Sequence, residues 1–372
     1  MPGAAIVKIS RRPYASKAGE SARGISRIRE RNCSIARTVA ILSDAWSFLV
    51  IREAFFGARR FESFRSALGL PRATLTERLK RLTRQGIFRQ IRYSQTSSRV
   101  EYRLTEAGLE LYPSFMAMMQ FGDRWLSDRK GPPLQLIHRD CGCECHPILA
   151  CSSCQQKVSA RRVSYRNGPG AGYSLAQPIH RARRSSDSSQ YLRGRPSSVS
   201  RTLQIIGDRW SFLIIREAFL GARRFDRLQT ELNIASNILT DRLLHLVRTG
   251  IFERRKYQGQ PDRYEYRLTE MGMDLYGALI MMMSWGDRWL SRAGQPIILT
   301  HRDCGKEFTP TVICNRCAKP IEANAMKYDL NYDPREFGAP EVSDRTAAIH
   351  EKNDMPPMSA PAGRKRSKRS KV

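Results

Sequence analysis

Apolar side chains recur at helical spacing near the start of the chain. Residues 34–43 and 46–56 predict two helices separated at Asp44, and Phe61–Leu68 predicts a short third helix that stops at Gly69. In the second helix the apolar stripe consists of Phe48, Leu49, Ile51 and Phe55. Because this spacing places the side chains on one face, we expect the stripe to pack into a core.

A fourth helix and a hairpin follow. Residues 72–84 predict a helix that ends before Gly86, a residue type that commonly terminates helices, and its inward-facing side chains are Leu75, Leu79 and Leu82. The segments IFRQIRY and RVEYRLT alternate in polarity around the polar tip SQTSS, which predicts two paired strands. Residues 106–127 then predict one long helix that carries Leu109, Phe115, Met119 and Trp125.

The same pattern occurs twice. DAWSFLVIREAFFGARRF (44–61) returns as DRWSFLIIREAFLGARRF (208–225), RVEYRLTEAGLELY (99–112) returns as RYEYRLTEMGMDLY (263–276), and GDRWLS occurs at 122–127 and 286–291. The offset is 164 throughout, and about half of the positions match. The chain therefore contains a duplicated domain. We call residues 33–154 the first copy and residues 197–317 the second copy.

The order of elements and motifs resembles one known family. Each copy carries W-S-F-L-[VI]-I-R-E, G-A-R-R-F, L-T-x-R-L, G-I-F and Y-x-L-T-x-x-G in that order. This arrangement is similar to that of the HxlR family of bacterial transcription regulators, and the resemblance covers 33–128 and 197–292. It implies a mainly α fold with small β-hairpin wings (α+β), in which tandem winged helix-turn-helix domains bind double-stranded DNA.

The resemblance also implies that the fourth helix of each copy enters the major groove. Between the copies the inward leucines persist, whereas Arg72, Ala73, Thr74 and Lys80 are replaced by Ser236, Asn237, Ile238 and Leu244. Arginine reads guanine and asparagine reads adenine, so the copies are expected to prefer different half-sites. Drift of an exposed helix is the alternative. The candidate reading residues are Arg72, Ala73, Thr74, Thr76, Arg78, Lys80, Ser236, Asn237, Thr240, Arg242 and His245.

The hairpins correspond to the wings of this fold. Their basic residues would contact phosphates and so position the protein rather than specify a sequence. A solvated charged hairpin is the alternative. The residues are Arg89, Arg92 and Arg99 in the first copy and Arg254, Arg255, Lys256 and Arg263 in the second.

The last helices of the copies hold more methionine and aromatic side chains than one small domain should bury. FMAMMQFGDRW and ALIMMMSWGDRW therefore predict a helix–helix interface. Packing of 106–127 on 270–291 would make one chain a monomeric pseudo-dimer, and a homodimer of chains is the alternative.

The net charge of +29 indicates a polyanionic partner. Much of it lies in 1–31, 155–195 and 364–372, which read as arms and linkers. This distribution keeps a second function open, an architectural, nucleoid-type protein that coats DNA, and a third, a protein-interaction platform. We find no nucleophile–base pair and no phosphate-binding glycine loop, so no enzyme is expected.

No apolar run of about 18 residues and no secretory signal is evident, so we expect a cytoplasmic, nucleoid-associated protein without a membrane partner. The expected boundaries add five segments to the two winged-helix domains. They are a basic arm (1–32), a first Cys/His lobe (134–160), a disordered basic linker (161–196), a second lobe (297–322) and a disordered tail (323–372).

Nine cysteines occur in the chain, and five of them lie in HRDCGCECHPILACSSC (138–154). The second copy keeps only part of this set, in HRDCGKEFTPTVICNRC (301–317), and the shared spacing is H-x2-C-x9-C-x2-C. Each set could hold one zinc ion in a small ribbon-like lobe of its own copy, which gives two ions per chain. Reduced thiols without metal, and histidines outside the ligand set, are the alternatives. The candidate ligands are His138, Cys141, Cys151, Cys154, His301, Cys304, Cys314 and Cys317.

Three residues of the first stretch have no counterpart in the second copy. Cys143, Cys145 and His146 correspond to Lys306, Phe308 and Thr309, so we do not expect them to be the shared ligands. Cys33 stands apart, where the second copy has Ser197. The resemblance implies a possible sensor of oxidants or electrophiles at Cys33, and a small buried residue is the alternative.

Overall fold

The computed structural model describes residues 29–42, 44–92, 100–175, 188–192, 194–259 and 262–337. Both copies fold into the same series of elements. The first copy contains α1 (Ser34–Leu42), α2 (Ala45–Phe55), α3 (Phe61–Leu68), α4 (Arg72–Arg84), β2 (Phe88–Arg92), β3 (Val100–Leu104), α5 (Glu106–Leu109) and α6 (Tyr112–Trp125). The second contains α7 (Ser198–Ile206), α8 (Arg209–Phe219), α9 (Phe225–Leu232), α10 (Ser236–Arg248), β8 (Phe252–Gly259), β9 (Asp262–Leu268), α11 (Glu270–Asp274) and α12 (Tyr276–Leu290). In the described part of the chain, no helix has the length and apolar character needed to cross a membrane.

The single helix expected at 106–127 is two helices in the structure, α5 and α6. Thr105 caps α5 by accepting a hydrogen bond from the backbone N–H of Gly108 at 3.1 Å. Pro113 stands in the first turn of α6, where its missing N–H breaks no helical hydrogen bond. The apolar periodicity continues across this break, which is why the pattern did not reveal it.

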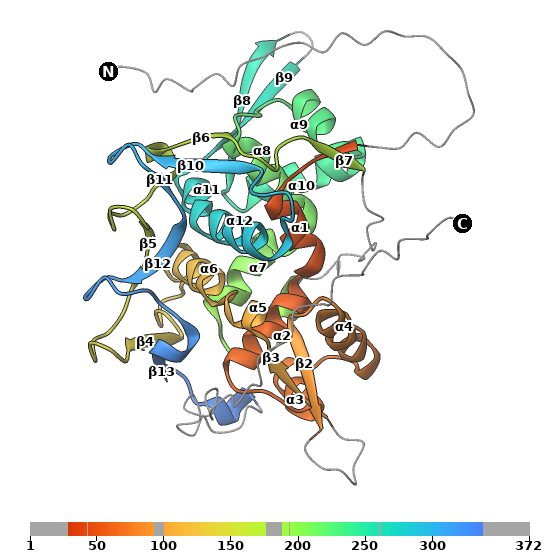
Figure 1. Ribbon diagram of the computed structural model, residues 1–372. Helices are drawn as coiled ribbons and strands as arrows, with labels where there is room; N and C mark the ends of the chain where they lie inside the picture. Colours follow the sequence, from red (N-terminus) through yellow and green to blue (C-terminus); the bar gives the residue numbers. More distant parts are fainter. Residues whose placement is uncertain are drawn as a thin grey trace, which may run out of the picture.

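The two copies pack on each other through exchanged helices (Figure 1). Helix α1 lies against α12 of the second copy, α7 lies against α6 of the first, and α6 and α12 also contact each other. The hydroxyl of Thr38 donates to the carbonyl of Met282 at 2.9 Å, and that of Thr202 donates to the carbonyl of Met118 at 2.9 Å. These equivalent contacts relate the copies by an approximate two-fold axis, and the expected pairing of 106–127 with 270–291 is present within one chain.

Two contacts join equivalent residues of the copies directly. The backbones of Asp44 and Asp208 form an isolated antiparallel bridge. The rings of Phe48 and Phe212 are stacked, with centroids 5.9 Å apart and an interplanar angle of 16°. Because Asp44 and Asp208 precede α2 and α8, the N-termini of these helices lie at the approximate axis.

Strands that follow the winged-helix part of each copy pair across the two copies. They are β4 (Leu134–His138), β5 (Pro147–Cys151), β6 (Val163–Asn167), β10 (Ile297–His301), β12 (Pro310–Cys314) and β13 (Met326–Leu330), of which β6 and β13 lie beyond the copies as bounded above. Strand β11 (Glu307–Phe308) pairs with β10 of its own copy. Strand β4 pairs with β13, β5 with β12, and β6 with β10, all antiparallel. The expected separate lobes at 134–160 and 297–322 are thus one interleaved unit, which lies on the left in Figure 1, whereas α4 and α10 lie on the right.

Parts of the segments expected to be arms or disordered linkers are strands. Strand β1 (Arg29–Arg31) pairs with β7 (Tyr173–Leu175), so the expected arm 1–32 and linker 161–196 contribute a small sheet. Strands β6 and β13 lie in the expected linker and tail. Strands β6 and β13 each pair with a strand of the other copy. The sequence of one copy alone therefore predicts linkers for these segments. Residues 1–28, 176–187, 193 and 338–372 of these segments lie outside the described residues.

Candidate nucleic-acid interface and metal sites

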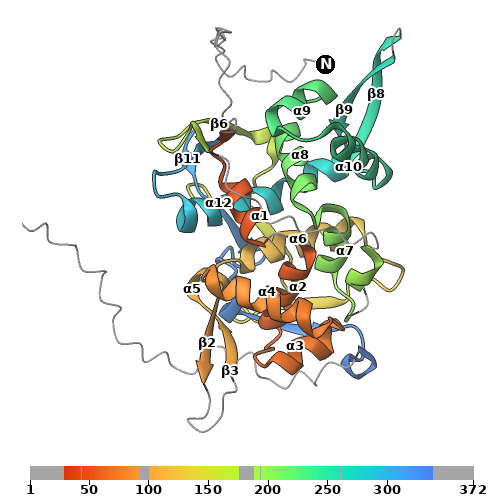
Figure 2. The ribbon, with the colours of Figure 1, turned by 90° about the vertical axis from the view of Figure 1, so that its right-hand side faces the viewer.

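The fourth helix of each copy packs on the core through three leucines. Leu75, Leu79 and Leu82 of α4 are fully buried, and so are their counterparts Leu239, Leu243 and Leu246 in α10. The residues on the opposite faces are mostly exposed. Both helices lie on the side of the molecule that faces the viewer in Figure 2. The exposed positions are Arg72, Ala73, Thr76 and Lys80 in α4 and Ser236, Asn237, Thr240 and Leu244 in α10, while Thr74 is half-buried.

Two arginines that the sequence placed on the reading face bind the protein instead. Arg78 pairs with Asp44 at 2.8 Å, and the equivalent Arg242 pairs with Asp208 at 2.9 Å. Their side chains are 16% and 10% exposed, so these guanidinium groups are held against the protein by their carboxylate partners. Arg78 and Arg242 therefore position their helices. The exposed side chains of α4 and α10 remain the candidates for contacts with DNA bases.

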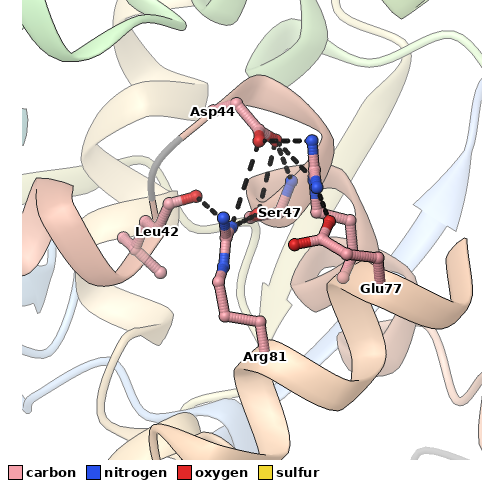
Figure 3. Close-up of polar contacts among 6 residues, drawn as sticks. Leu42, Asp44, Ser47, Glu77 and Arg81 are labelled. Carbon is pink, nitrogen blue, oxygen red and sulfur yellow. Dashed lines mark hydrogen bonds and ion pairs between the residues drawn. The ribbon is translucent and has the colours of Figure 1, made fainter. Parts of the chain in front are cut away.

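Asp44 organises this contact and also caps α2 (Figure 3). Its carboxylate accepts a hydrogen bond from the backbone N–H of Ser47 at 3.0 Å. Arg81, which sequence reasoning missed, donates to the Ser47 hydroxyl at 2.6 Å and is 7% exposed at its side chain. Its spacing of three residues from Arg78 is the signal that could have placed both on one face. In the second copy His245 replaces Arg81, and its Nε2 lies 3.2 Å from the carbonyl oxygen of Ile205.

The wings carry exposed basic residues, and the two wings differ. Strands β2 and β3 have five residues each, whereas β8 and β9 have eight and seven. The longer wing is supported by Arg254, which lies over the Tyr264 ring at 4.1 Å, and by Arg224, which lies over Tyr257 at 4.4 Å. The candidate wing residues that the structure describes are all exposed: Arg89, Arg92, Arg254, Arg255, Lys256 and Arg263. Arg99 lies outside the described residues.

The eight candidate metal ligands form two clusters, but not the two that the sequence predicted. One cluster contains His138, Cys141, Cys314 and Cys317, and the other contains Cys151, Cys154, His301 and Cys304. In each, the ligand atoms lie within 4.8 Å of one another. The prediction of one complete ligand set per copy is therefore wrong, since each cluster takes two ligands from each copy.

Strand pairing explains the exchange. Strands β5 and β12 pair antiparallel around Leu149 and Val312, so Cys151 lies opposite Pro310 and Cys314 lies opposite Pro147. With this register, the C-x2-C pair of each copy lies next to the His-x2-Cys pair of the other copy. The linear spacing H-x2-C-x9-C-x2-C is the same for both partitions, so spacing alone could not distinguish them.

The geometry of the clusters fits a tetrahedral metal site. In the first, His138 Nδ1 lies 3.2 Å from Cys317 Sγ and 3.6 Å from Cys141 Sγ, and the Sγ atoms of Cys141 and Cys314 are 4.0 Å apart. In the second, His301 Nδ1 lies 3.3 Å from Cys154 Sγ and 3.7 Å from Cys304 Sγ. Zinc bond lengths imply ligand–ligand edges of about 3.5–3.8 Å. Both histidines are fully buried and direct Nδ1 at the thiols, which favours them as ligands.

Cys33 is buried, with 6% of its surface exposed. It is close to the guanidinium group of Arg216 and lines a cavity together with Tyr165 and Tyr276. This environment corresponds to the second interpretation given for Cys33, a small buried residue. Cys143 is exposed and Cys145 is buried, and neither belongs to a cluster.

Comparison with known proteins identifies relatives of both copies. A family model described as HxlR-like helix-turn-helix matches residues 41–130 and again residues 205–294. An uncharacterised HTH-type transcriptional regulator of Mycobacterium tuberculosis is 47% identical over 127 residues, which are 34% of this chain and 80% of that protein. Another from Synechocystis is 42% identical over 95 residues, 25% of this chain and 70% of that protein. A solved structure described as a transcription factor from Pseudomonas aeruginosa is 41% identical and covers 29% of this chain and 73% of that chain, with a TM-score of 0.24.

Proposed function

Because the chain belongs to the HxlR-like helix-turn-helix family, we propose that it is a DNA-binding transcription regulator in which one chain supplies both winged-helix units. The observation that carries this proposal is the exchanged packing of α1 with α12 and of α7 with α6. In this arrangement the two-fold-like unit that would otherwise need two chains is present in one. The exposed faces of α4 and α10 are the surfaces that would read DNA.

The residues of the GDRW motif support this assignment of the interface. In α12, Asp287 accepts a hydrogen bond from the Ser34 hydroxyl at 2.5 Å, and Trp289 Nε1 donates to Glu110 at 2.8 Å. In α6, Asp123 accepts from Ser198, and Trp125 Nε1 donates to Asp274 at 2.8 Å. The polar groups of each GDRW motif thus form hydrogen bonds with the other copy, which accounts for the presence of the motif in both copies.

The network at the approximate axis would hold the two reading helices in a fixed relation. Arg78 of α4 binds Asp44, Asp44 pairs through its backbone with Asp208, and Asp208 binds Arg242 of α10. Paired helix-turn-helix units read half-sites about one helical turn, roughly 34 Å, apart. We expect the site to contain two different half-sites at that spacing, because the exposed side chains of α4 and α10 differ.

For the metal clusters we propose zinc, one ion in each. A closed set of one imidazole and three thiolates is a structural zinc site that holds no open position for catalysis. His138 and Cys141 would share an ion with Cys314 and Cys317, and the other four residues would share the second ion. Because every set joins both copies, the ions would fix the copies to each other on the side away from α4 and α10.

The decisive experiment is selection of bound fragments from a random duplex library by the purified full chain, followed by light scattering of the complex. The proposal expects one chain on two unlike half-sites. A dimer of chains on a perfect palindrome would contradict the single-chain arrangement. Binding that shows no sequence preference at any salt concentration would contradict sequence-specific regulation itself.

A further inference from the structure

Two equivalent cavities lie between the copies. The first is lined mainly by aromatic and methionine side chains from α2 and α6, by the start of α7, and by β13. The second is its counterpart and is lined by α8, α12, the start of α1 and β10. Mostly apolar cavities with a few polar groups are the usual binding sites of small organic molecules. Each cavity has one buried arginine in its wall, Arg52 in the first and Arg216 in the second.

The charges behind the second cavity are balanced. Arg216 pairs with Glu217 at 2.5 Å, and Arg31 pairs with Glu231 at 2.5 Å and with Glu217 at 3.8 Å. Two guanidinium groups therefore face two carboxylates. Such a set needs no further anion.

The charges behind the first cavity are not balanced. Arg52 pairs with Glu53 at 2.6 Å, and Arg195, the counterpart of Arg31, pairs with the same carboxylate at 3.1 Å. The position equivalent to Glu231 is Ala67, which is buried and whose carbonyl oxygen adjoins Gly194. In the part of the chain that the structure describes, Glu53 is the only carboxylate within ion-pair distance of Arg52 or Arg195, so this cluster carries an excess positive charge.

That excess charge is buried and has unused hydrogen-bond donors. Arg195 is 4% exposed, and its Nε and Nη1 atoms have no hydrogen-bond partner among the described residues. Its guanidinium lies 4.5 Å from the ring centre of Phe56, which lines the first cavity. Tyr332, which also lines the cavity, has its hydroxyl beside Arg195, and the Tyr328 hydroxyl in the same wall is buried without a hydrogen-bond partner among the described residues. A buried cation and unpaired donors are costly unless an acceptor satisfies them.

We propose that the first cavity binds a small aromatic carboxylic acid. Its carboxylate would be held by the net positive charge of Arg52, Glu53 and Arg195, of which Arg52 lines the cavity, and would accept a hydrogen bond from the Tyr328 hydroxyl, because a guanidinium group matches a planar carboxylate. Its ring would occupy the apolar space lined by Phe55 and Phe115. The second cavity, with its balanced charges, would not bind the acid, so the stoichiometry is one molecule per chain. This site is independent of the reading helices and of the metal clusters.

The test is calorimetric titration of the full chain with 2-naphthoate and, as a neutral match, 2-naphthamide. The acid should bind once per chain and at least about tenfold more tightly than the amide, since hydrogen bonds to a charged group are worth that much. Arg195→Gln should remove the preference for the acid, and the matched variant Arg31→Gln at the second cavity should keep it. Equal affinity for acid and amide, two acid molecules per chain, or no binding of the acid at millimolar concentration would overturn the proposal.

A second variant keeps the test valid should Arg195→Gln fail to fold. Ala67→Glu places in the first copy the carboxylate that Glu231 provides in the second. It should neutralise the excess charge, stabilise the chain against heat and abolish binding of 2-naphthoate. Unchanged binding of the acid by Ala67→Glu would show that the excess charge does not hold the ligand. DNA binding enters none of these readouts, so their outcome is separate from that of the proposed regulator function.

Discussion

In the first copy α4 presents Arg72 and Lys80 to solvent, whereas in the second copy α10 presents Ser236 and Leu244 at the same positions. Leu244 is 48% exposed. The residues at the interface between the copies, in contrast, have not diverged. Ser34 and Ser198, Thr38 and Thr202, and the two GDRW motifs are the same in both copies and make the same contacts. The duplication has thus kept the interface symmetric while the outer faces have become different.

The largest effect is expected from variants that distinguish two kinds of metal cluster, those shared between the copies and those complete within one copy. Cys141→Ser with Cys314→Ser changes one cluster of the structure, so it should cost one zinc ion per chain. Cys141→Ser with Cys151→Ser changes both clusters and should cost two ions, with several kcal/mol of unfolding free energy because metal binding and folding are coupled. Elemental analysis of protein purified without chelator measures the difference. If each copy bound its own ion, the two double variants would give the reverse result.

The thiols outside the clusters provide the control for this experiment. Cys143→Ser changes an exposed thiol that is not a ligand in the structure, so it should leave two ions per chain and the same unfolding midpoint. Loss of an ion from Cys143→Ser would mean that the first cluster recruits a different set of thiols. Less than one ion in the unmodified chain would contradict the zinc proposal altogether.

The metal clusters also show what the sequence could and could not predict. Spacing identified all eight candidate ligands, and apolar periodicity located α1 to α4 to within a residue or two, because both are local properties. The partition of the ligands and the roles of β6 and β13 depend on which strand pairs with which, and that is a non-local choice. Arg78 was assigned to the reading face for a similar reason, since its partner Asp44 lies far away in the sequence, immediately before α2.

The symmetric interface should be sensitive to added side-chain volume. A Cβ on Gly122 would lie 2.3 Å from the carbonyl oxygen of Ser198, and one on Gly286 would lie 2.6 Å from that of Ser34. Overpacking of this kind costs about 1–3 kcal/mol, so Gly122→Ala and Gly286→Ala should each lower the unfolding free energy by that amount in urea denaturation. Equal losses at both positions would support a symmetric interface.

A third glycine of the same helices is the matched control. Gly277 of α12 has only side-chain atoms at 3.8 Å or more around its Cβ position. Gly277→Ala should therefore be neutral or stabilise the helix by up to about 1 kcal/mol, the ordinary difference between the two residues. Destabilisation by Gly277→Ala comparable to that of Gly122→Ala would show that an added methyl group anywhere on these helices, and not the close helix crossing, sets the response.

The difference between the reading helices predicts a one-sided effect on DNA binding. If Arg72 contacts a base, Arg72→Ala should weaken binding by about 1–3 kcal/mol and relax sequence preference in one half-site only. Ser236→Ala is the equivalent change in the other copy and should affect the other half-site. Binding to a panel of single-base variants of the selected site measures both. An equal loss in both half-sites for Arg72→Ala would mean that the modules pair across chains.

The smallest effect is a pH dependence of the interface. Burial raises the pKa of the Asp287 carboxyl to about 6, although the hydrogen bond from Ser34 and the charge of Arg37 lower it. Burial also raises the pKa of Asp123, against the hydrogen bond from Ser198 and the charge of Arg201. A carboxyl with a higher pKa in the folded chain than in the unfolded chain takes up a proton on folding, so its contribution to stability grows as pH falls and is lost as pH rises through about 6.

Asparagine in place of Asp287 removes this titration and retains an oxygen that can accept from Ser34. The unfolding free energy of the unmodified chain relative to Asp287→Asn should therefore decrease between pH 5 and pH 7, as measured by urea denaturation at several pH values. Asp123→Asn should give a change of the same sign, because the equivalent carboxyl is buried in the equivalent contact. A difference that does not vary with pH would show that Asp287 stays charged in the folded chain, and that its contact with Ser34 and Arg37 outweighs its burial.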